Sequence, residues 1–151
     1  MSDSLDQPVL PPIGFVADLK DEDRELLSSY GEFLPANPEH DLIEQGWPQE
    51  HLFLLISGQL EVRRTGLEKD VLIGVINPGE SVGETSVFDP GPASATVRPR
   101  EFSQVWRIDR DSLNSYLADN PVAGVILLIG IATALSQRVR LLTASLTDAL
   151  S

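Results

Sequence analysis

The side chains most often used in catalysis are sparse in this sequence. It contains no cysteine and only two histidines, His40 and His51. The lack of cysteine excludes disulfides, thiolate metal sites and cysteine nucleophiles, and the two isolated histidines lack the ligand spacing of a metal centre. Neither a Gly-x-Ser-x-Gly elbow nor a phosphate-loop motif is present. We therefore predict that the protein is not an enzyme and holds no metal.

Residues 80–97 form the segment with the most distinctive chemistry. Three acids, Glu80, Glu84 and Asp89, lie in it together with several hydroxyl side chains, and it contains no lysine or arginine. The first bases that follow are Arg98 and Arg100. The segment is therefore a local concentration of acid without a base of its own.

Length and charge bound the class of protein. The chain has 151 residues, a formal net charge of −12 and a hydrophobic content of 42%. These values are typical of one folded soluble domain. Phosphate groups require a basic footprint, so we expect neither nucleic acid nor an anionic membrane as a partner. The chain ends at Ser151 without a predicted helix-turn-helix, which agrees with that expectation. Because no signal peptide is evident and cysteine is absent, we expect a cytoplasmic location.

Short β-prone runs separated by turn residues fill residues 32–110. Their spacing is typical of an antiparallel sandwich or barrel. We count eight runs and predict a mainly β fold, an eight-stranded antiparallel jelly roll with flanking helices. The predicted strands are residues 33–34, 41–43, 52–56, 59–63, 71–76, 80–82, 95–97 and 104–108.

Helices are expected on both sides of this roll. Acids in the first turn and Gly31 at the end predict a helix over residues 21–30. After the roll, Asp111 is expected to cap a short helix, and Asn120 with Pro121 is expected to begin a long one.

The domain organisation follows from these elements. The proline-rich start, residues 1–13, is predicted to be a flexible arm. Residues 14–151 are predicted to form a single domain, with the roll at about 32–110 and the C-terminal helices at about 111–150.

The long helix carries an apolar seam. Residues at alternating steps of four and three keep a 3.5-residue period over three heptads, which is typical of a coiled coil. They are Leu128, Ala132, Leu135, Val139, Leu142, Leu146 and Ala149. A seam of this length requires a long apolar partner, so we predict a homodimer through this helix; the alternative is that the helix lies back across the roll. Its uncharged stretch, residues 122–135, would be only about 21 Å long, shorter than the hydrocarbon core of about 30 Å.

Three motifs resemble those of a known family, and so does the predicted order of a short helix, a β-roll, a second short helix and a long helix. They are HLFLLISGQLEV at residues 51–62, INPGESVGETSVF at 76–88 and PASATVRP at 92–99. They resemble the cyclic-nucleotide-binding domain, the family of the bacterial catabolite activator protein and of the regulatory subunits of protein kinase A. The resemblance runs from about residue 14 to residue 146. It implies a β-roll that regulates other proteins and binds a cyclic nucleotide such as cyclic AMP or cyclic GMP.

The resemblance also implies which residues meet that ligand. Glu84 takes the place of the carboxylate that accepts from the ribose 2′-hydroxyl; the alternative is a relic of that site, which only caps the adjacent helix. The amides of Thr85 and Ser86 can face the phosphate. Thr143 is the candidate for the hydroxyl on the long helix that meets the purine; the alternative is a solvated helix position. The full set of implied binding residues is Val82, Gly83, Glu84, Thr85, Ser86, Ala93, Ser94, Ala95, Thr96 and Thr143.

One implied binding residue departs from the family pattern. Ala93 stands where the family has the arginine that binds the cyclic phosphate. Hydrogen bonds to charged groups are worth about 1.5–3 kcal/mol each, so losing a bidentate pair costs at least a hundredfold in affinity. We therefore expect weak or absent binding of ordinary cyclic AMP, unless Arg98 or Arg100 turns inward and replaces the missing base.

Three functions remain open at this point. In the first, the domain senses a cyclic nucleotide atypically and signals through partner contacts. In the second, the site has lost its ligand and the fold serves as a protein-interaction or assembly module. A cupin-like enzyme is the third, which the absence of paired metal ligands disfavours.

Overall fold

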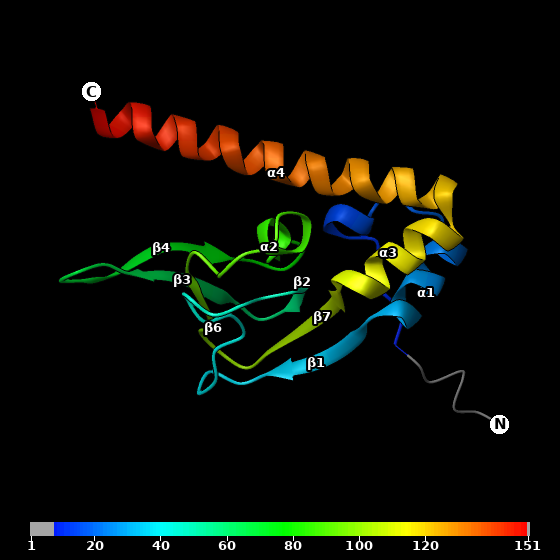
Figure 1. The fold of residues 1–151 in the computed structure, drawn as a ribbon, viewed down its shortest axis with the longest axis horizontal. Helices are drawn as coiled ribbons and strands as arrows, with labels where there is room; N and C mark the ends of the chain where they lie inside the picture. The colour runs from blue at the N-terminus through cyan, green and yellow to red at the C-terminus, as the bar shows by residue number, and fades with distance from the viewer. Residues whose placement is uncertain (1–7, 151) are drawn as a thin grey trace.

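The computed structural model describes residues 8–150, so the first seven residues of the expected arm and Ser151 lie outside the described residues. Seven strands and the helices that flank them follow one another in the expected order (Figure 1). The helices are η2 (Gly14–Val16), α1 (Asp21–Tyr30), α2 (Glu84–Phe88), α3 (Arg110–Asp119) and α4 (Pro121–Leu150). The strands are β1 (Glu32–Ala36), β2 (His51–Ser57), β3 (Leu60–Thr65), β4 (Asp70–Ile76), β5 (Ser81–Val82), β6 (Thr96–Pro99) and β7 (Ser103–Asp109).

The strands form two antiparallel sheets. One has the order β1-β7-β2-β5 and the other the order β4-β3-β6. No strand pairing joins the two sheets within residues 8–150, so they do not close into a barrel. The mainly β class with flanking helices is confirmed.

The prediction of eight strands was wrong by one, at residues 41–43. Only Ile43 forms a β-bridge there, to Val97 of β6, and no longer ladder develops. The segment is short because the chain turns soon after it, at Gly46, which has φ +87°. The segment thus contributes one bridge and no strand.

Two hydrophobic clusters make up the core. The larger joins η2, α1, β2, β7, α3 and the first half of α4, and Trp106 and Tyr116 are fully buried in it. The smaller lies between the two sheets around Phe53 and Val97. Leu10, in the segment expected to be an arm, is 1% exposed in the larger cluster, and its amide donates to Ser28 Oγ at 2.9 Å.

The short helix α3 begins two residues earlier than expected. Asp109, and not Asp111, is its N-cap, because the Asp109 carboxylate accepts from the Ser112 amide at 2.7 Å. This hydrogen bond lowers the pKa of Asp109 below its ordinary value. The predicted cap residue lies in the first turn of the helix, where its charge still favours the helix dipole.

Helix α4 begins at Pro121, as expected, and has two unlike halves. Its buried residues are Ala123, Gly124, Leu127 and Ile131, and Gly130 packs against the backbone of η2. From residue 132 to residue 150 no residue is buried. By length and composition alone α4 is sufficient to cross a bilayer, but core helices of soluble proteins pass the same test. Figure 1 shows α4 running past η2 and α2 toward the β3–β4 hairpin.

Candidate functional site

A pocket of about 580 Å³ lies between the second sheet, helix α2 and helix α4. This volume lies within the ordinary range of small-molecule sites. Most of the residues that the sequence predicted to bind a ligand line it: Val82, Gly83, Glu84, Thr85, Ser86, Ala93, Ser94 and Ala95. Two stretches that are apart in the sequence thus line one pocket.

The turn that carries the first stretch requires glycine. Gly83 has φ +90°, the left-handed region, and a Cβ on it would lie 2.2 Å from the His51 carbonyl oxygen. The side chain of Gln49 ties the turn to β2, since its Nε2 donates to the Gly83 carbonyl at 3.4 Å and to the His51 carbonyl at 2.8 Å. These contacts bring the start of α2 against β2 and so fix where Glu84 can point.

Glu84 is the only acid among the buried polar residues of the described chain, at 4% exposed. Its Oε2 accepts from the Ser81 hydroxyl at 2.7 Å, and its Oε1 accepts from Arg138 Nη1 at 2.7 Å. Arg138 Nη2 also donates to the Ser81 carbonyl. A buried carboxylate needs such partners, because desolvation of an unpaired charge is costly. The acid that the resemblance implied for ribose binding is therefore in the pocket wall and already paired with a base.

The second stretch forms another part of the wall and is held by backbone hydrogen bonds. The Ala93 amide donates to the Trp47 carbonyl at 2.9 Å, and the Ala93 carbonyl accepts from the Gly46 amide at 2.8 Å. Ala93 is 7% exposed and contributes no charge to the pocket. Thr96 is not among the lining residues; its hydroxyl oxygen accepts from the Gln45 amide at 3.1 Å.

One face of α4 closes the pocket. Its lining residues recur at three- and four-residue steps, as one face of a helix requires: Gly130, Thr133, Ala134, Gln137, Arg138, Leu141 and Leu142. Thr143, the predicted hydroxyl on this helix, lies outside the lining, is exposed, and donates to the Val139 carbonyl at 2.9 Å. Thr133 is a hydroxyl residue of the same helix that does line the pocket.

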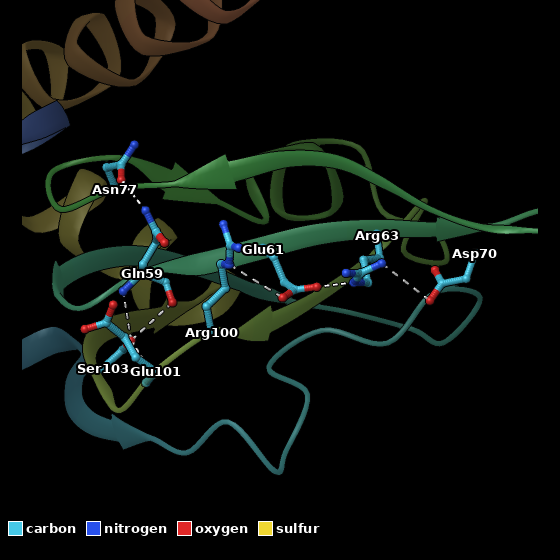
Figure 2. A network of polar contacts seen from close by, with 8 residues as sticks. All are labelled: Gln59, Glu61, Arg63, Asp70, Asn77, Arg100, Glu101 and Ser103. Carbon is cyan, nitrogen blue, oxygen red and sulfur yellow. Dashed lines mark hydrogen bonds and ion pairs between the residues drawn. The ribbon is translucent and has the colours of Figure 1, made fainter.

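Neither Arg98 nor Arg100 turns inward to replace the base that is missing at Ala93. Arg98 Nε donates to Asp41 Oδ1 at 2.7 Å, and both arginines are exposed and outside the pocket lining. Figure 2 shows Arg100 directed toward Glu61 on β3, with Arg100 Nε 3.9 Å from Glu61 Oε1. Both bases are engaged by surface acids of the second sheet and its neighbouring loop.

Arg138 is the functional residue that sequence reasoning missed. Its position between two seam residues, Leu135 and Val139, suggested a side chain beside the helix interface. The available signal was spacing, because Arg138 stands four and eight residues after Ala134 and Gly130, which also face the pocket. That face could be identified only after the rotation of α4 on the roll was known.

Both histidines lie apart from any cluster of potential metal ligands in residues 8–150. No group of three metal-ligating side chains occurs within the part of the chain that the structure describes. His51 lies at the start of β2, and burial, with help from the charge of Arg107, lowers the pKa of its imidazole. His51 is therefore mostly neutral at pH 7.

Comparisons with known proteins agree with this geometry. Residues 35–120 match the family model described as "Cyclic nucleotide-binding domain". The CRP-like cAMP-activated global transcriptional regulator of Mycobacterium tuberculosis is 31% identical over 110 residues, which cover 72% of this chain and 47% of that protein. The chain therefore spans about half the length of this curated relative.

Two solved structures are similar over most of the chain. A cyclic nucleotide-binding domain from Methylobacillus flagellatus matches with a TM-score of 0.78 at 27% identity, covering 85% of this chain and 72% of that one. The catabolite activator protein of Thermus thermophilus matches with a TM-score of 0.77 at 25% identity, covering 93% of this chain and 63% of that one.

Proposed function

Because this chain belongs to the cyclic nucleotide-binding domain family, we propose that it is a regulatory domain that senses a cyclic nucleotide, such as cyclic AMP or cyclic GMP, in the pocket beneath α4. The observation that carries the proposal is Glu84, a buried carboxylate in the wall of a pocket of about 580 Å³. A ribose hydroxyl is a natural donor to such a carboxylate. Sensing is atypical, because Ala93 leaves the second stretch without a cation.

The function proposed is regulation and not catalysis. The pocket combines one buried acid with an arginine, hydroxyls and apolar side chains, which suits recognition of a polar ligand. Ligand binding between the sheets and α4 would favour one position of that helix, and the shift is limited by the difference in affinity between the two positions. We also propose a cytoplasmic location for this sensor.

The test is calorimetric titration of the wild-type domain and of Glu84→Gln with cyclic AMP and with cyclic GMP. The amide keeps an acceptor for Ser81 but removes the charge, so the fold is expected to persist. We expect heat of binding for at least one nucleotide in the wild type, and at least a tenfold weaker affinity in the variant. Arg98→Ala, which changes an exposed ion pair outside the pocket, is the control. No heat from either nucleotide at millimolar concentration would contradict the proposal.

A second function is favoured by the pairing of Glu84. Its carboxylate is already satisfied by Ser81 and Arg138, so the described fold needs no ligand to neutralise it. On this reading the domain is a ligand-free interaction or assembly module. The same titrations decide between the two, because a module gives no heat with either nucleotide and yet remains folded.

The partner proposed for signalling is a second copy of this chain, bound through α4. Six of the seven residues of the predicted seam are exposed, among them Leu128 at 38%, Val139 at 61%, Leu142 at 59% and Leu146 at 61%. The chain's own roll leaves most of this stripe uncovered, the exceptions being Leu135, which packs against the core, and Leu142, which lines the pocket. The 3.5-residue period of the stripe matches a like helix. Sedimentation velocity is expected to give a dimer at micromolar concentration and a monomer for the double variant Val139→Glu, Leu146→Glu, whose two positions lie outside the pocket lining. A wild-type monomer at high micromolar concentration would contradict the dimer.

A further inference from the structure

The charges that line the pocket are unequal. Asp18, Glu80 and Glu84 are the acids among the lining residues, and Arg138 is the only base among them. A cyclic nucleotide is an anion and needs a charge-assisted donor at its phosphate. Arg98 and Arg100 are engaged elsewhere, so the pocket offers one side chain for this task.

The contacts of Arg138 suit a change of partner. Its guanidinium has five N–H donors, and two of its nitrogens make the contacts to Glu84 and Ser81. The side chain is 36% exposed, whereas that of Glu84 is 5% exposed. The base is therefore the accessible member of the pair, and its long stem allows the guanidinium to move while the helix stays in place.

Glu84 keeps a partner when the arginine leaves. The Ser81 hydroxyl donates to the other carboxylate oxygen at 2.7 Å and does not depend on Arg138. A ribose hydroxyl can then take the place that Arg138 Nη1 occupies on Oε1. The ligand would thus supply a partner for each member of the ion pair, a hydroxyl for the acid and a phosphate for the base.

We propose that Arg138 is the phosphate-binding cation of this pocket, which moves from Glu84 to the ligand and replaces the base that is absent at Ala93. This inference rests on the proposed function, since it requires that a cyclic nucleotide binds. It makes nucleotide affinity depend on a residue of α4, the helix proposed to contact a second copy. Specificity for an anionic ligand therefore comes from the helix and not from the second stretch of the site.

The experiment titrates cyclic AMP into four proteins: the wild type, Arg138→Gln, Arg138→Lys, and the double variant Ala93→Arg, Arg138→Gln. Circular dichroism first establishes that each is folded. Arg138→Gln is expected to lose roughly tenfold to a hundredfold in affinity, the worth of one or two charged hydrogen bonds. Arg138→Lys keeps the charge without the bidentate fork and is expected to lose less.

The double variant separates a phosphate contact from structural support of Glu84. An arginine at position 93 would enter the pocket from the second stretch and not from α4, so recovery of affinity would show that the pocket needs a cation and not that particular ion pair. Wild-type affinity in Arg138→Gln would overturn the inference while leaving the proposed function intact. A loss that is equal in Arg138→Lys and unrestored by Ala93→Arg would also overturn it, because Arg138 would then act only as support. A wild type that gives no heat would overturn both.

Discussion

The contact between α4 and η2 can be tested by a single added carbon atom. A Cβ on Gly130 would lie 2.3 Å from the Phe15 carbonyl oxygen and 3.1 Å from its carbonyl carbon, which are backbone atoms that cannot rotate away. Gly124 of the same helix is a matched control, because its Cβ would meet Leu117 Cδ2 at 3.0 Å, the end of a flexible side chain. Of the two glycines, Gly124 is buried and Gly130 is half-buried.

The expected loss of stability in Gly130→Ala follows from those distances. Ordinary contact begins near 3.4 Å, so Gly130→Ala requires η2 and α4 to separate by about 1 Å. Overpacking of this kind costs about 1–3 kcal/mol. Alanine also improves helix propensity by about 0.8–1.0 kcal/mol, but that gain is common to both variants and cancels in their comparison. We expect the free energy of unfolding of Gly130→Ala to be about 1–3 kcal/mol below that of Gly124→Ala.

Equilibrium urea unfolding, followed by circular dichroism and by the fluorescence of the fully buried Trp106, measures this difference. Because Gly130 also lines the pocket, the same displacement is expected to weaken nucleotide binding in Gly130→Ala more than in Gly124→Ala. If Gly130→Ala is as stable as Gly124→Ala, α4 does not lie on η2 as described, and the wall it gives to the pocket is misplaced.

Two further predictions concern charged groups away from the pocket. Asp109→Ala removes the N-cap of α3 and is expected to cost about 1 kcal/mol at pH 7. The pKa of Asp109 is lowered in the folded state, so its stabilisation is present above the ordinary aspartate pKa and lost as pH falls through the lowered one. Urea unfolding is expected to give a smaller difference in the free energy of unfolding between wild type and variant below pH 4 than at pH 7. An equal difference at both pH values would contradict the role of Asp109 as N-cap. Arg98→Ala breaks an exposed ion pair and is expected to change stability by less than about 1 kcal/mol. The nucleotide affinity of this variant, measured by calorimetry, is expected to stay within about twofold of the wild-type value. A large loss of affinity would show that Arg98 contributes to the binding site.

Local pattern was sufficient to predict most elements of this fold. Helix α1 ends at Tyr30 before Gly31, and α4 begins at Pro121, because acids, glycine and proline act through neighbouring backbone groups. The strands from residue 51 onward follow the alternation and turn residues of the sequence. Residues 41–43 have the composition of a strand, but only the neighbouring chain decides how many ladder hydrogen bonds they form.

Pocket-lining residues were predicted within two short stretches of the sequence and missed on the distant long helix. Residues 82–86 and 93–95 reach the pocket together because each stretch lies beside a short strand of the roll. Arg138 joins them from more than forty residues away, and its presence depends on how α4 is rotated against η2 and α2. The same rotation leaves Thr143 outside the lining. A sequence with no base in residues 80–97 therefore still places one at the carboxylate of Glu84.

The most direct test of the account is a crystal structure of the domain grown with cyclic AMP. The account predicts electron density for one nucleotide in the pocket beneath α4. It also predicts a ribose hydroxyl within hydrogen-bond distance of Glu84, and Arg138 moved from that carboxylate to the phosphate. Crystals grown at millimolar nucleotide with an empty pocket and an unchanged Glu84–Arg138 pair would contradict it.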